Sequence, residues 1–123
     1  MADFTVRFHY QSREGGSWTG TSTNISFQSE NPSLAELKTL VMAKSRNYLN
    51  VRISEVEKRG CSKVSFNVRF HYKRRENESG NGTGTSTTVS WFNDNPSMSD
   101  IEALVLGQKY DCYSVSIDEI RKK

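Results

Sequence analysis

The sequence predicts an α+β protein built from two copies of one β-β-α-β unit, giving two mainly antiparallel three-stranded sheets that each carry one helix. The first observation behind this is an internal repeat. Three segments recur unchanged: residues 6–10 as 68–72, residues 19–23 as 83–87, and residues 31–33 as 95–97. The second is that the apolar periodicity changes from two to 3.6 and back in the same order in both copies. The units are expected to span residues 1–60 and 63–123 as two repeats, with the joint around residues 59–62.

The first expected strand of each unit alternates between apolar and polar side chains, which is typical of a strand with one buried face. Its apolar positions are Phe4, Val6, Phe8 and Tyr10 in one copy and Phe66, Val68, Phe70 and Tyr72 in the other. Turn-rich stretches at residues 12–17 and 76–82 then predict hairpins. The second copy has two extra residues between Glu76 and Thr83, as expected of a surface loop. A second strand is expected through residues 21–27 and 85–91.

A helix is expected to follow in each unit. Ser33 with Glu36 forms a capping box, and Ser97 with Asp100 forms a weaker version of it. One helical stripe carries the apolar residues Leu34, Leu37, Leu40 and Val41, matched in the second copy by Met98, Ile101, Leu104 and Val105. The last expected strand carries Leu49, Val51 and Ile53, matched by Tyr113, Val115 and Ile117.

A unit of about 60 residues buries too small a fraction of its surface to be comfortably stable alone. The two units are therefore expected to dock and share a core. A pseudo-twofold axis is the expected relation between them, through joined sheets or through packed helices. The sequence does not choose between these two modes.

Length and composition exclude several classes of protein. A chain of 123 residues is too short for a TIM barrel or a dinucleotide-binding enzyme of usual size. It contains no apolar run of about 18 residues, so no membrane association is expected. Because the first residues lack the basic and apolar regions of a signal peptide, a cytoplasmic location is expected.

No metal, cofactor or catalytic centre is expected. Cys61 and Cys112 lie at non-equivalent places in the two copies and belong to no zinc-binding spacing, so reduced thiols are expected. The glycines of residues 80–84 lack the Gly-Lys-Ser/Thr ending of a phosphate-binding loop and precede a strand. His9 and His71 have no acid placed by the sequence to orient them. We therefore expect a protein that is not an enzyme.

Strand alternation predicts a hydroxyl-rich, mildly basic sheet face opposite the helices, and the repeat duplicates it. Its expected members are Thr5, Arg7, His9, Ser22, Asn24, Ser26, Arg52 and Ser54, with Arg69, His71, Thr88, Ser90, Ser116 and Asp118 in the second copy. One interpretation is a solvated outer face, which antiparallel sheets routinely have. The other is a ligand surface that presents arginine and histidine twice.

Two kinds of macromolecule could bind such a surface. Arginines, hydroxyls and the run Lys73, Arg74 and Arg75 suit phosphate contacts. However, the net charge is only +3, and the outward positions offer no aromatic stacking platform. For a protein partner, the divergent hairpin loops are suitable contacts, and Trp18 in one of them is either folded onto the core or exposed as an anchor.

The leading hypothesis is a small binding protein, not an enzyme, that acts by occupying a macromolecular partner. We expect this partner to be a protein and not a nucleic acid. The unit is similar in size and layout, though in no motif, to small proteins of phages and mobile elements, which suggests an inhibitor or adaptor of the anti-defence type. The expected partner-binding residues are Arg7, His9, Trp18, Arg69, His71, Lys73, Arg74 and Arg75. The alternatives are a weak nucleic-acid-binding protein that uses the same face and a structural subunit that self-assembles. The oligomeric state is not predicted.

Overall fold

The computed structural model describes residues 2–14, 16–77, 80, 82–109 and 112–123. The first unit contains β1 (Ala2–Ser12), β2 (Trp18–Phe27), α1 (Leu34–Met42) and β3 (Tyr48–Lys58). The second contains β4 (Val64–Lys73), β5 (Thr83–Trp91), α2 (Met98–Gln108) and β6 (Ser114–Lys122). The α+β class and the repeated β-β-α-β order are confirmed. Of the expected second hairpin loop, residues 78, 79 and 81 lie outside the described residues.

Each unit forms one antiparallel sheet with its first strand in the middle. The strand orders are β2-β1-β3 and β5-β4-β6. The registers also repeat, because Phe4 pairs with Ile25 in the first sheet and Phe66 pairs with Val89 in the second. The alternation of the central strands thus places the same apolar positions on the same face of both sheets.

Both helices begin at the capping boxes expected from the sequence. In α1 the Ser33 side chain accepts a hydrogen bond from the amide of Glu36, whose carboxylate accepts one from the amide of Ser33. Ser97 and Asp100 make the same reciprocal pair in α2. These bonds satisfy amides that have no acceptor within the helix, and they fix where each helix leaves the preceding loop.

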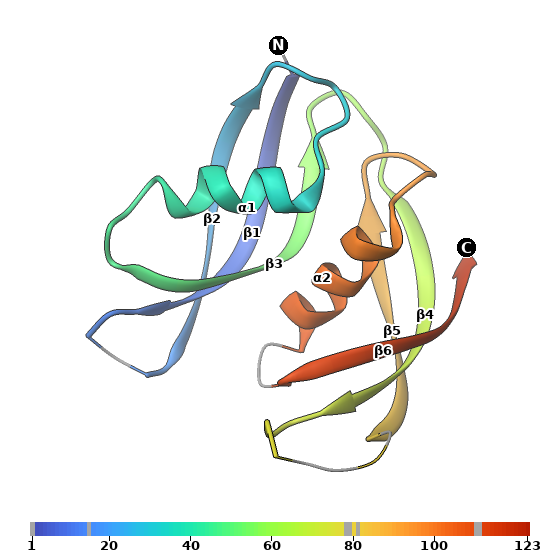
Figure 1. Ribbon diagram of the computed structural model, residues 1–123. Helices are drawn as coiled ribbons and strands as arrows, with labels where there is room; N and C mark the ends of the chain where they lie inside the picture. Colours follow the sequence, from blue (N-terminus) through green and yellow to red (C-terminus); the bar gives the residue numbers. More distant parts are fainter. Residues whose placement is uncertain (1, 15, 78–79, 81, 110–111) are drawn as a thin grey trace.

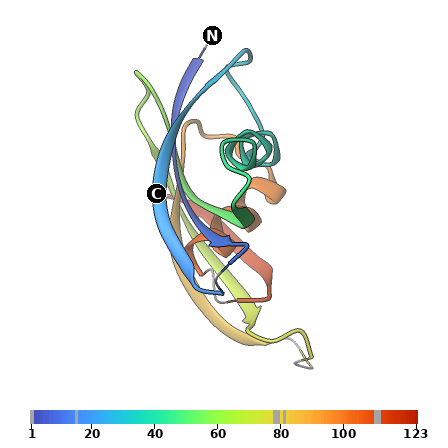
Figure 2. The same ribbon diagram turned by 90° about the vertical axis from the view of Figure 1, so that its left-hand side faces the viewer.

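The helices cover one side of the strands and leave the other side open. Figure 2 shows both helices on the same side of a curved layer of strands. We call the side that carries the helices the inner face and the opposite side the outer face. One continuous apolar cluster lies on the inner face and joins side chains from both units, from Phe4 and Val6 to Trp91 and Leu104.

The two units pack head to tail. Besides its own sheet and helix, β3 contacts β5 and α2 of the second unit (Figure 1). A twofold axis would bring equivalent strands together, whereas β3 is the third strand of its unit and β5 is the second. The expected pseudo-twofold axis is therefore not confirmed, and the arrangement leaves β2 at one end of the molecule and β6 at the other.

Helix α2 forms the center of this contact between the units. The backbone of Gly107 lies so close to β3 that an added Cβ would stand 1.9 Å from the carbonyl oxygen of Ile53. The side-chain amide of Gln108 donates a hydrogen bond to the carbonyl of Ser54 over 3.0 Å. One Asp100 oxygen accepts from the amide of Leu34, the first residue of α1, while the other accepts from the amide of Ser97. Asp100 thereby ties the starts of the two helices together.

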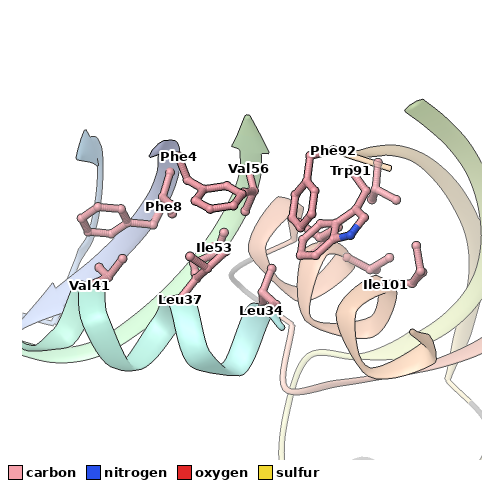
Figure 3. Close-up of a cluster of buried hydrophobic side chains, with 14 of the residues drawn as sticks. Phe4, Phe8, Leu34, Leu37, Val41, Ile53, Val56, Trp91, Phe92 and Ile101 are labelled. Carbon is pink, nitrogen blue, oxygen red and sulfur yellow. The ribbon is translucent and has the colours of Figure 1, made fainter. Parts of the chain in front are cut away.

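Aromatic packing continues this contact along β3. Phe92, which directly follows β5, meets Phe4 of β1 edge-on with ring centroids 5.2 Å apart. The Lys58 ammonium lies 5.9 Å from the Phe92 ring centroid. Figure 3 shows Leu34 pointing into the space between Ile53 of the first unit and Ile101 of the second. The shared core was expected from the size of one unit, and α2 is the element that completes it.

No helix in the described part of the chain is long and apolar enough to cross a membrane.

Replacing Gly107 with alanine should destabilise the protein by about 1–3 kcal/mol, because the new methyl group would collide with the backbone of β3. Helix propensity acts in the opposite direction, since alanine stabilises a helix interior by about 0.5–1 kcal/mol relative to glycine. Urea unfolding followed by circular dichroism measures the difference. The matched control is Gly16→Ala, where an added Cβ meets nothing within 4 Å. Equal stability of the two variants would contradict the close packing of α2 on β3.

Candidate functional site

The outer face carries the duplicated polar positions, and a β-bulge determines which residues join them. Arg7 pairs with Glu55 and Phe8 with Ile53, so Ser54 is the extra residue of the bulge. The second sheet repeats this bulge, with Arg69 opposite Glu119 and Asp118 as the extra residue. The bulge moves the glutamates onto the outer face, opposite the arginines.

The repeated arginines are paired with these glutamates. An Arg7 nitrogen lies 3.6 Å from a Glu55 oxygen, and an Arg69 nitrogen lies 3.8 Å from a Glu119 oxygen. Glu119 also holds Arg121. The outer face therefore has charges of both signs close together, and its arginines are partly neutralised where the sequence predicted a mildly basic surface.

Lys63 adds a second cation beside Glu55, which already pairs with Arg7. Its ammonium lies 2.6 Å from a Glu55 oxygen and 3.1 Å from a Glu57 oxygen. The hydrogen bonds that the Lys63 ammonium donates to Glu55 and Glu57 raise the pKa of Lys63 above its ordinary value, with a smaller contribution from the charges of the two carboxylates. These two ion pairs link Lys63, which directly precedes β4, to β3 of the first unit.

The repeated histidines lie across glycines of the neighbouring strand. His9 pairs with Gly20 and His71 with Gly84, and in each pair a Cβ on the glycine would stand 3.2–3.3 Å from the imidazole Nε2. The glycine in each copy thus makes room for the imidazole ring. The copies differ beyond this point, because His71 Nδ1 lies 2.5 Å from an Asp118 oxygen, and Ser54 occupies the equivalent position in the first unit.

Trp18 lies at the start of β2 and is partly buried. The Arg52 guanidinium carbon stands 5.3 Å from its ring centroid, and Arg52 also donates a hydrogen bond to the carbonyl of Cys112 over 2.6 Å. Trp18 lines a hollow of about 360 Å³ together with Leu34 and Ala103 from the two helices. Its position is thus intermediate between the two alternatives that the sequence left open.

The basic run of residues 73–75 begins at the end of β4, and its first residue has a different environment from the two that follow. Lys73 is the last residue of the strand and lines a hollow of about 430 Å³ with His71 and Asp118. Arg74 and Arg75 follow the strand and are exposed, with the Arg74 guanidinium 5.6 Å from the Tyr72 ring centroid. By register, Arg7, His9 and Trp18 belong to the outer face of the first sheet, although Trp18 also borders the hollow that both helices line. Arg69, His71 and Lys73 share the outer face of the second sheet, and the other two arginines lie beyond the strand.

Groups that could support metal or thiol chemistry are not assembled in the described residues. They contain no cluster of three or more side chains suited to holding a metal ion. Cys61 is exposed, Cys112 is buried, and neither forms a disulfide. A hollow of about 870 Å³ opens beside Cys61 and is bordered by Asp3, Asn24 and Lys63.

A partly exposed apolar surface, which the sequence pattern did not indicate, lies on the inner face of β6. Val115, Ile117 and Ile120 are only half-buried, whereas their equivalents Val51, Ile53 and Val56 on β3 are 0–1% exposed. Met98 at the start of α2 is 58% exposed, whereas its equivalent Leu34 is 3% exposed. We call these four residues of the second unit, Met98, Val115, Ile117 and Ile120, the β6 patch.

The difference in exposure has one cause, which is the head-to-tail packing. Helix α2 lies across β3 and seals the first set of residues, and in the described part of the chain no element lies in the equivalent position over β6. The repeat did reveal the equivalent residues, but only the packing direction shows which set is left uncovered.

Comparisons of this chain with family models, with curated proteins and with solved structures find no match.

Truncating equivalent isoleucines should give unequal losses of stability. Ile53→Ala removes a fully buried side chain and should cost about 2–5 kcal/mol. Ile117→Ala removes a half-buried one, and we expect roughly half that loss because less apolar surface leaves water there on folding. Chemical denaturation of the two variants checks this, and equal losses would show that the inner face of β6 is as well covered as that of β3.

Proposed function

We propose that the protein is a small binding protein, not an enzyme, that acts by occupying a protein partner, and that the β6 patch is part of its contact surface. The observation that carries the proposal is the contrast between Met98, 58% exposed, and its sealed equivalent Leu34. An apolar surface left open at one end of a repeat array is the kind of surface that protein partners cover. The patch continues a core that already extends across the junction of the two units.

The opposite end of the molecule, formed by the first unit, is polar where the β6 end is apolar, and this difference supports the assignment. Helix α1 and its C-cap present Glu36, Thr39 and Ala43 to solvent at the positions equivalent to Asp100, Ala103 and Gly107, which lie on the side of α2 that packs on the first unit. A polar terminal surface of this type keeps a repeat array soluble. Since one end is polar and the other apolar, we assign partner binding to the β6 end.

The residues expected from the sequence remain proposed contributors on a second surface. His9, Trp18, His71 and Lys73 line the outer face, where a partner that reaches around the β6 end could contact the second unit first. The pairing of Arg7 and Arg69 with glutamates makes these arginines candidates for specificity and not for the main binding energy, because exposed ion pairs contribute about 0–1 kcal/mol each.

Replacing Met98 with glutamate should abolish partner capture while the protein stays folded, because the side chain is exposed and its new charge would be buried on binding. The measurement is affinity capture from the source cells, followed by titration of the captured protein with each purified variant. We expect affinity to fall more than tenfold for Met98→Glu. The matched control is Leu49→Glu, an exposed apolar residue of the first unit at 49%. Equal effects of the two substitutions, or no saturable partner, would contradict the proposal.

A nucleic-acid-binding function is the second candidate, and the exposed Arg74 and Arg75 beside Lys73 are the observation that favours it. A phosphate-binding surface predicts a steep loss of affinity with salt, with about one logarithmic slope unit for each phosphate neutralised. Because the neighbouring arginines are paired with glutamates, we expect no such binding. Titration of labelled DNA and RNA at low and physiological salt, followed by amide shifts, tests this. Salt-sensitive shifts at residues 69–75 would favour the nucleic-acid function instead.

A further inference from the structure

The molecule contains its own example of what covers a surface like the β6 patch. On β3, the residues Val51, Ile53 and Val56 lie beneath α2, whose backbone at Gly107 approaches the Ile53 carbonyl. The equivalent residues on β6 are Val115, Ile117 and Ile120, so the two surfaces differ only by one methylene group at the last position. The aromatic residues behind them are also the same, with Phe4 and Phe8 in the first sheet and Phe66 and Phe70 in the second.

Three features of α2 make it complementary to β3. Gly107 allows the backbones to approach, since any side chain there would collide with the strand. Asp100, seven residues earlier, accepts a hydrogen bond from the amide of Leu34 at the start of the neighbouring helix. Gln108 donates a hydrogen bond to the carbonyl of Ser54, which the bulge turns away from the ladder. The β6 end offers counterparts of these partners, because Ile117, Met98 and Asp118 occupy the equivalent positions.

A second copy of this chain does not supply such a helix. In α1 the equivalent of Gly107 is Ala43, whose methyl group would meet the carbonyl of Ile117 if α1 packed on β6 as α2 packs on β3. The equivalent of Phe92, which packs on Phe4 at the junction, is the polar residue Gln28. Head-to-tail polymerisation through this surface is therefore opposed by both shape and polarity.

We infer that the β6 patch is a docking site for an α-helix of a different protein, one that carries a glycine where it crosses β6 and an acidic residue about two turns earlier. This inference rests on the proposed function and specifies the chemistry of the partner. The helix lies across the inner face of β6, with its glycine against the carbonyl of Ile117 and its carboxylate at the start of α2. It completes the second unit as α2 completes the first.

The test uses the intact protein and a peptide of residues 97–109, which carries both Asp100 and Gly107. A staple between positions 99 and 102, both exposed on α2, holds the peptide helical without changing the face that packs on β3. The isotope-labelled protein is titrated with the peptide and followed by NMR. We expect saturable shifts at residues 98, 115, 117 and 120, and at least tenfold weaker binding of a peptide with Gly107→Val.

Three results would overturn the inference. The first is the absence of saturable shifts at these residues up to about 1 mM peptide, which corresponds to a binding free energy weaker than about −4 kcal/mol. The second is equal binding of the Gly107→Val peptide. The third is self-association of the protein that Met98→Glu abolishes, since the occupant would then be a second copy.

The inference and the proposed function fail in different ways. If the peptide does not bind but partner capture still depends on Met98, the proposed function stands and the helix is the wrong occupant. If the peptide binds with the expected dependence on glycine but no partner is captured, the docking chemistry stands and the proposed function falls.

Discussion

The packing of α2 across the inner face of β3 is the contact on which the rest of the structure depends. A single β-β-α-β unit is too small to seal its own sheet, and α1 alone does not cover β3. Gly107 lets the backbone of α2 approach the strand, and Asp100 joins the starts of both helices through hydrogen bonds. Because these groups come from the second unit, the first unit is complete only when the second is docked on it, and we expect the two to unfold together.

The same contact makes the molecule asymmetric. Head-to-tail packing of two equivalent units necessarily leaves two different ends, whereas a twofold arrangement would have buried the same surface of each unit. At one end, α1 replaces the residues that α2 uses for docking with Glu36, Thr39 and Ala43, so that end is polar. At the other end, the residues that α2 would cover remain apolar. The two units therefore differ in the helix surface that docks and agree in the strand surface that receives a helix, which is why we assign the open strand surface to a partner.

Much of the fold could be predicted from the sequence, because alternation, capping boxes and the repeat are local signals. The bulge in β3 also had a signal, since the buried positions Val51, Ile53 and Val56 change from a spacing of two to a spacing of three. Without the bulge, Glu55 and Glu119 were not recognised as partners of the repeated arginines, and the outer face was interpreted as more basic than it is. The packing direction had no local signal. It depends on the complementarity of a whole helix to a strand in the other unit, and only the difference between Gly107 and Ala43 hinted at it.

The central claim is that equivalent side chains are sealed on β3 and open on β6, and methyl NMR with a soluble paramagnetic agent tests it without any substitution. Methyl groups of Val51, Ile53 and Val56 should keep their signal intensity as the agent is added. Those of Met98, Val115, Ile117 and Ile120 should lose intensity, because the agent reaches them from solvent. Equal protection of both sets would mean that something in the chain covers β6 as α2 covers β3, and the account of an open docking surface would then be wrong.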